Sequence, residues 1–203
     1  MEKTLVFALL IIIYPNIAIA EETETNQNTP WNFESQKTLY VLINSESEIS
    51  ESKKAIINDV IMSEKVVMLD NQNKFKGWQG ALNQIHYSDN TPIKLIFTDN
   101  EKPTNMILIN LEDEPTEFDD SSEFDGFTKF DLYENKIVKS HIVIYNTKNL
   151  NDVEFETLLR HEFGHSLGLA HSDNINNVMF PLLDQSNPYI TNDDISALSL
   201  LYV

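Results

Sequence analysis

Apolar and polar residues along the chain form short blocks with two different periods. Short apolar runs bounded by Asn, Asp, Ser or Pro predict strands, and residues 140–145 form a buried one. Residues 126–133 instead alternate between apolar and polar positions, which is typical of an edge strand. Glu134-Asn135 is expected to turn the chain back from it as a hairpin. The predicted strands are residues 38–43, 65–69, 93–97, 106–111, 126–133 and 140–145.

Apolar residues spaced three and four positions apart predict helices. One of these helices has clear ends. Asn151 or Asp152 caps its start, with Glu154 in the capping-box position. Gly168 ends it, because glycine adopts the left-handed backbone conformation at a helix end with the least strain. Strands come early and helices late, which indicates an α+β fold. The predicted helices are residues 51–62 and 77–85, a segment from about 153 to 168, and a last one from about 191.

The first twenty residues, 1–20, predict a signal peptide. Lys3 precedes an apolar run, and Ala18-Ile19-Ala20 offers the small residues that a signal peptidase reads. An uncleaved membrane anchor is the competing interpretation, but Pro15 and Asn16 interrupt the run and leave it short for a span. We expect residues 21–36 to be a flexible acidic segment and residues 37–203 to form the domain.

Charge and cysteine content narrow the class of protein. The formal net charge is −18, which opposes binding to nucleic acid or to an anionic membrane. The chain has no cysteine, so disulfides are excluded. We expect a monomer that is secreted to the medium or cell envelope and that keeps no stable membrane association after signal cleavage. The acidic loop 112–125 is either a solvated loop or a calcium site, so Ca²⁺ is a further candidate cofactor.

The most informative stretch is His161-Glu162-Phe163-Gly164-His165-Ser166-Leu167-Gly168-Leu169-Ala170-His171. His161 and His165 are four residues apart, so on a helix they share a face and can hold one zinc ion. Glu162 lies beside the metal as a general base. Gly168 ends the helix and lets His171 return as a third ligand. Three protein ligands leave a coordination position open, which is the mark of a catalytic site.

These residues also have plainer interpretations. A lone histidine is usually a surface or core residue, but five matching positions at fixed spacing on a capped helix are not expected by chance. A binding protein with an inactive zinc cleft would have no need of Glu162. The capped helix, and the spacing of Met179 from His171, argue against an envelope protein with incidental metal. Arg160, the chain's single arginine, precedes His161 and is expected to form an ion pair on the helix surface.

The same stretch resembles the extended zinc signature of the metzincins, and more narrowly that of the matrixins, the matrix metalloproteinase family. Ser172 directly follows the third histidine. Val178-Met179-Phe180-Pro181 resembles the family's Met-turn, with Met179 eight residues after His171. Residues 191–202, with paired aspartates and a terminal Leu-Tyr, resemble its closing helix. The specific resemblance covers residues 140–203.

The resemblance implies a metzincin-like architecture. This is a twisted mixed sheet with helices, an active-site helix and a small C-terminal subdomain after His171. It also implies a zinc metalloendopeptidase that hydrolyses internal bonds of protein or peptide substrates with one catalytic Zn²⁺. Met179 is implied to lie beneath the metal. Pro181 and Leu182 are implied to form the wall of the main specificity pocket.

The resemblance further places residues 126–133 at the sheet edge above the cleft. An extended substrate could then pair with the backbone of Gly126, Phe127, Thr128 and Lys129. The family often binds calcium in this part of the sheet. Two departures stand out. The chain has no cysteine that could block the zinc and keep the enzyme latent, as a propeptide cysteine commonly does in the family. Only two histidines lie outside the zinc motif, too few for a second, structural zinc site, so we expect one zinc ion per chain.

Overall fold

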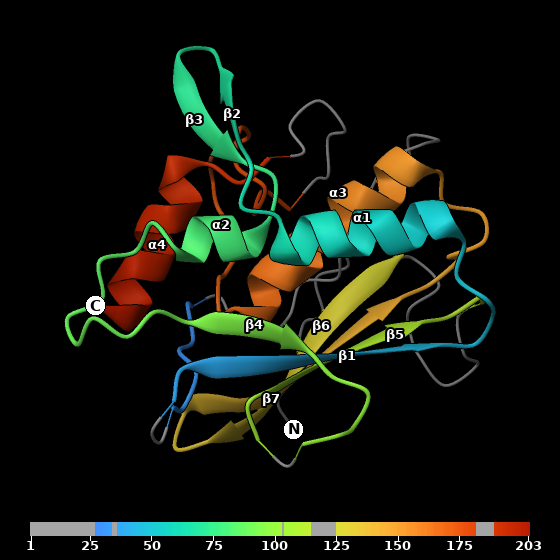
Figure 1. Ribbon diagram of the computed structural model, residues 1–203, viewed down its shortest axis with the longest axis horizontal. Coiled ribbons are helices and arrows are strands. Elements are labelled where there is room, and N and C mark those ends of the chain that lie inside the picture. Colours follow the sequence, from blue (N-terminus) through green and yellow to red (C-terminus); the bar gives the residue numbers. More distant parts are fainter. Residues whose placement is uncertain (1–26, 34–35, 103, 115–124, 182–188) are drawn as a thin grey trace, which may run out of the picture.

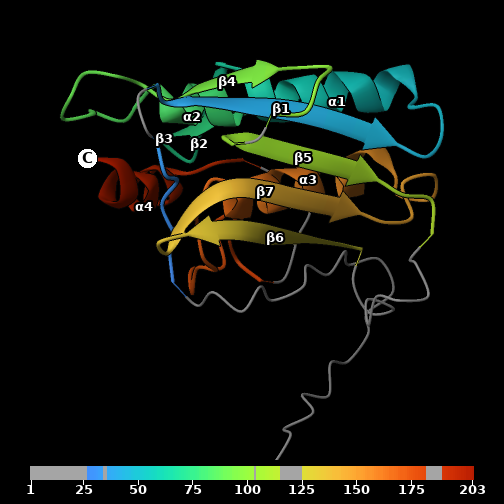
Figure 2. The same ribbon diagram turned by 90° about the horizontal axis from the view of Figure 1, so that it is seen from below.

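The computed structural model describes residues 27–33, 36–102, 104–114, 125–181 and 189–203. A five-stranded sheet has the order β4-β1-β5-β7-β6, and β2 and β3 form a separate two-stranded sheet. Strands β1, β4, β5 and β7 are parallel, whereas β6 pairs antiparallel with β7 and is the last strand of the sheet (Figure 2). The strands are β1 (Thr38–Ser45), β2 (Val66–Leu69), β3 (Gln72–Phe75), β4 (Lys94–Phe97), β5 (Met106–Leu111), β6 (Gly126–Tyr133) and β7 (Lys136–Ile144).

The helices cover one face of this sheet. Helices α1 and α3 contact each other above the strands, and α3 also contacts β6 and β7 (Figure 1). Helix α4 contacts α2, beside the end of α3. The predicted mixed sheet with helices is confirmed, and α3, which carries the histidine motif, packs on β6 and β7 with α1 beside it. The helices are α1 (Glu51–Met62), α2 (Trp78–Leu82), α3 (Asp152–Ser166) and α4 (Asn192–Tyr202).

Local signals fix where the two later helices begin. The Asn151 side chain accepts hydrogen bonds from the backbone of Val153 and Glu154, and the Glu154 carboxylate accepts one from the backbone of Asn151. This is the predicted capping box, which satisfies otherwise orphaned N–H groups at the helix start. Thr191 and Asp194 form a second capping box at the start of α4. The predicted ends of β5, β6 and α1 are confirmed as well.

Three features differ from the expected elements. The chain forms a β2–β3 hairpin where one strand was predicted, because Asp70 and Asn71 both take positive φ and make a tight turn. Strand β7 begins at Lys136 rather than at the predicted residue 140, because it pairs with β6 directly after the Glu134-Asn135 turn, and that turn is confirmed. Helix α2 is shorter than predicted.

Residues 27–33, which the sequence analysis placed in the segment before the domain, pack against it. Trp31 is buried, and its indole N–H donates to the Ser166 carbonyl at 2.8 Å. The Thr29 N–H donates to the Gly168 carbonyl at 2.8 Å. Tyr202, near the other end of the chain, accepts from the Trp31 N–H and donates to the Leu167 carbonyl. Segments from both ends of the chain therefore satisfy carbonyls at the end of α3.

Among the described residues, no helix is both long enough and apolar enough to cross a bilayer. The expected signal peptide, residues 1–20, lies outside the described part of the chain.

Candidate metal centre

Helix α3 buries the polar residues of the motif completely. His161 and Glu162 are inaccessible to solvent and His165 is 1% exposed, because the sheet covers the helix on one side and α1 on another. Burying polar groups is costly unless each finds a partner. The contacts of these side chains therefore indicate what the site is built to hold.

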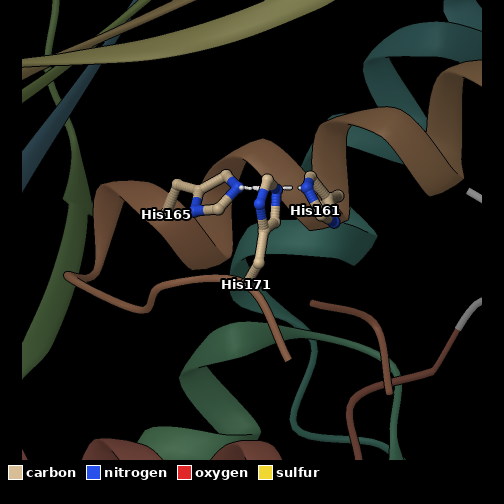
Figure 3. Close-up of side chains that lie close together, drawn as sticks. All are labelled: His161, His165 and His171. Carbon is tan, nitrogen blue, oxygen red and sulfur yellow. Dashed lines mark hydrogen bonds between the residues drawn. The ribbon is translucent and has the colours of Figure 1, made fainter. Parts of the chain in front are cut away.

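The chain turns sharply after α3 and returns to it. Gly168 has a φ of +96°, and the turn carries His171 back to the face that His161 and His165 share (Figure 3). The Nε2 atom of His165 lies 3.0 Å from that of His161 and 3.1 Å from that of His171. The predicted approach of the three imidazoles is thus observed.

Backbone carbonyls orient two of the three rings. The Nδ1 atom of His161 lies 2.7 Å from the Val178 carbonyl, and that of His165 lies 2.8 Å from the Leu169 carbonyl. A carbonyl can only accept, so each Nδ1 carries a hydrogen and each Nε2 keeps its lone pair. The lone pairs of both rings are thereby fixed on the Nε2 atoms that converge.

Electrostatics keep the same rings neutral. Burial lowers the pKa of His161 well below its usual value, and the neighbouring His165 lowers it further. Burial likewise lowers the pKa of His165 to about 3, with His171 as the second cause. Neutral imidazole is the form that binds a metal ion.

This set of donors fits zinc. Three His nitrogens at the usual Zn–N distance of about 2.0–2.1 Å in tetrahedral geometry are about 3.4 Å apart, which is close to the separations between the Nε2 atoms here. His161, His165 and His171 are also the one group of three potential metal ligands found among the described residues. Three nitrogen ligands leave a fourth position for water or substrate.

Glu162 is held from the neighbouring edge strand. The Thr128 hydroxyl lies 2.7 Å from Oε2 of Glu162 and 3.0 Å from its backbone carbonyl oxygen. Thr128 is fully buried, so its side chain turns inward from β6. Thr128 was predicted to lie in a substrate-binding strand, but this side-chain contact was not predicted. The alternation of side chains along β6 places Thr128 on the inner face of the sheet, and this alternation is the sequence feature that could have indicated the contact.

Met179 packs directly against the motif helix. A Cβ atom on Gly164 would lie 2.3 Å from the Met179 sulfur and 2.8 Å from the ring of Trp78. The glycine between the two helical histidines thus makes room for the Met-turn side chain, which is 2% exposed. Pro181 is half-buried, and Leu182 lies outside the described residues.

Arg160 is not on the helix surface. Its guanidinium is fully buried, with Nε donating to the Lys76 carbonyl at 3.1 Å and one terminal nitrogen 2.5 Å from Glu156. The expected ion pair within the helix is present, but the expected exposure was wrong because the loop before α2 covers this face of α3. Burial lowers the pKa of Arg160, and the Glu156 carboxylate opposes that shift.

The remaining candidate ligands lie elsewhere. His86 is exposed in the loop after α2, and Nε2 of His141 lies 3.3 Å from Asp131 on the outer part of the β6–β7 hairpin. Most of the acidic loop proposed for calcium, residues 115–124, lies outside the described part of the chain. Asp113, at its described end, pairs with Lys148 and Ser47, and these partners lower its pKa.

Comparison with known proteins agrees with this geometry. The sequence model of the matrixin family matches residues 31–203. Human matrix metalloproteinase-20 is 39% identical over 59 residues, which are 28% of this chain and 12% of that protein. Interstitial collagenase from Bos taurus is 40% identical over 57 residues, 28% of this chain and 12% of the relative. The collagenase from Aquarana catesbeiana is 40% identical over 53 residues, 26% of this chain and 14% of the relative. The aligned regions are thus a small part of these relatives' length.

Proposed function

The chain belongs to the matrixin family, and from that membership we propose that it is a zinc-dependent metalloendopeptidase that hydrolyses internal bonds of proteins or peptides. The observation that carries the proposal is the convergence of three imidazoles beside a buried carboxylate, with the rings of His161 and His165 oriented by backbone carbonyls and kept neutral by burial. In this proposal His161, His165 and His171 hold one zinc ion, and Glu162 is the general base.

The proposed chemistry divides between the metal and the chain. A zinc ion on these nitrogens supplies Lewis-acid chemistry, which makes water nucleophilic near neutral pH and polarises a carbonyl. Glu162 accepts a proton as water attacks the scissile carbonyl and returns it to the leaving amine. Burial of Glu162 and of the helical histidines excludes bulk water, which strengthens charge interactions at the site.

Strand β6 supplies the proposed substrate-binding edge. It is the last strand of the sheet, and its residue Thr128 contacts the proposed general base, so its free edge runs beside the metal centre. An extended peptide can add itself there as a further strand, held through the backbone of Gly126, Phe127, Thr128 and Lys129. Main-chain pairing accepts many sequences, so we expect broad substrates. Pro181 and Leu182 are proposed as one wall of the main specificity pocket.

The proposal also covers the location of the protein, its oligomeric state and its substrate. We propose that residues 1–20 direct export, that the mature protein acts outside the cytoplasm as a monomer, and that it carries one zinc ion. The relatives' names refer to matrix and interstitial collagen substrates, but the aligned regions cover little of those proteins. A peptide or protein substrate without further specification is therefore the proposal.

The test compares the purified protein with Glu162→Ala on a library of quenched fluorescent peptides, with zinc measured by elemental analysis. We expect one zinc ion per chain in both proteins, cleavage by the wild type that a chelator abolishes, and a fall in rate of about 10² to 10⁴ in the variant, because proton transfer typically contributes that much. Zinc-loaded wild-type protein that cleaves no peptide would indicate a binding protein instead. Substantial turnover by zinc-loaded Glu162→Ala would refute the role of Glu162.

A further inference from the structure

The side chain of Thr128, which lies outside the zinc motif, contacts two atoms of Glu162. Its hydroxyl lies 2.7 Å from the carboxylate oxygen Oε2 and 3.0 Å from the backbone oxygen. All these atoms belong to residues that are completely buried. The contact between the hydroxyl and Glu162 is therefore shielded from bulk solvent.

A threonine hydroxyl has one hydrogen to donate and two acceptors in reach. The hydroxyl lies closer to the carboxylate oxygen, at 2.7 Å, than to the backbone oxygen, at 3.0 Å. The hydrogen therefore points to Oε2 of Glu162. This bond ties one carboxylate oxygen to the strand and thereby restricts the positions that the other oxygen can take.

We propose that Thr128 is a positioning residue that orients the Glu162 carboxylate for proton transfer. This inference rests on the proposed function. The support for the hydroxyl is rigid, because Thr128 sits in β6 paired with Ile142 of β7, and its β-branched side chain has few rotamers. The carboxylate, by contrast, ends a flexible side chain with several rotatable bonds. Strand β6 would thus serve the reaction twice, with its backbone on the substrate and one side chain on the base.

The kinetic test uses Thr128→Val, which keeps the shape and removes the hydroxyl, and Thr128→Ser, which keeps the hydroxyl. Ser140→Ala is the matched control, because Ser140 is fully buried on β7 and its hydroxyl has no hydrogen-bond partner among the described residues. We expect kcat of Thr128→Val to fall about 10- to 100-fold, since small misplacement of a catalytic group has effects of that size, with KM and zinc content unchanged. Thr128→Ser should restore most of kcat, and Ser140→Ala should resemble the wild type.

A second test needs no activity. In metal-free protein, Thr128→Val is combined with Glu162→Ala, and urea unfolding midpoints are measured for the wild type, both single variants and the double variant. If the hydroxyl holds the carboxylate, Thr128→Val lowers the midpoint much more when Glu162 is present than when it is alanine. The remaining bond to the backbone oxygen accounts for any loss in the alanine background.

The outcomes separate this inference from the proposed function. If the wild type cleaves peptides and Thr128→Val keeps kcat within about twofold, or if Thr128→Ser is as impaired as Thr128→Val, the positioning role is refuted. Equal midpoint shifts in both backgrounds refute the contact itself. A wild type without peptidase activity overturns the proposed function, while the unfolding cycle still decides whether Thr128 holds Glu162.

Discussion

Substituting Gly168 by alanine tests how the third histidine reaches the site. Gly168 has a φ of +96°, which L side chains rarely adopt. A Cβ atom there would also lie 2.0 Å from the carbonyl oxygen of Thr29. That oxygen belongs to the backbone, so relief requires the segment containing Thr29 to move away from the turn.

The expected cost follows from these two effects. Positive φ costs a residue other than glycine about 1–2 kcal/mol. Displacing the segment breaks the bond from the Thr29 N–H to the Gly168 carbonyl and endangers the one from the Ala170 N–H to the Asn28 side chain, each worth about 0.5–1.5 kcal/mol. Alanine also stiffens the unfolded chain, which returns about 0.4–1 kcal/mol. We therefore expect Gly168→Ala to lower the free energy of unfolding by about 2–4 kcal/mol.

Urea unfolding followed by tryptophan fluorescence measures this change, with Thr29→Ala as a control that leaves the backbone oxygen in place and should cost little. In a variant that lacks residues 21–29, the clash is gone, so Gly168→Ala should cost only the backbone term. A loss below about 0.5 kcal/mol in the full-length protein would refute the reasoning, because the turn would then not need glycine.

Three further predictions concern the metal centre and the sheet edge. His171→Ala should weaken zinc binding more than about 100-fold in chelator competition, because losing a ligand costs more affinity than losing a residue that only hydrogen-bonds to a ligand. An unchanged zinc affinity would mean that the third ligand lies elsewhere. Metal-free protein should lose stability as pH falls below about 6.5, because the unfolded histidines take up protons there while burial keeps the pKa of His161 and His165 lowered. For two such groups the slope approaches about 2.7 kcal/mol per pH unit, and a flat unfolding profile between about pH 6.5 and 5 would contradict it. A crystal structure with an extended peptide inhibitor should have hydrogen bonds to the backbone of residues 126–133, and an inhibitor bound away from β6 would refute the proposed substrate edge.

Local signals predicted the parts of the molecule that depend on neighbouring residues. The caps of α3, the turn at Glu134-Asn135 and the glycine after the zinc helix are each determined by residues within a few positions, and all three are confirmed. The approach of the three histidines was predictable for the same reason. Helical spacing placed two of them on one face, and a single glycine returned the third.

Contacts between distant segments were not predictable in the same way. Arg160 was expected at the surface because its own helix gives no sign that the loop at Lys76 covers it. The hydroxyl of Thr128 meets Glu162 across 34 positions of sequence, and no pattern in either segment announces the pairing. Residues 21–36 were expected to be flexible on composition, whereas Trp31 within them was expected to pack, and it is buried with its indole N–H donating to the Ser166 carbonyl.

The bonds that join Trp31, Tyr202 and the end of α3 also bear on the order of folding. The Trp31 N–H reaches the Tyr202 hydroxyl across 171 positions of sequence, and that hydroxyl reaches the Leu167 carbonyl. Closing so long a loop costs entropy before any contact repays it, so such contacts form late. The hairpin of β6 and β7, which is local, can form early. The turn that delivers His171 has local bonds of its own, from Gly168 to His165 and from Leu169 to Gly164, so it can form before these long-range contacts. We expect the contacts that Trp31 and Tyr202 make with the end of α3 to be added to it late in folding, after the zinc ligands have come together.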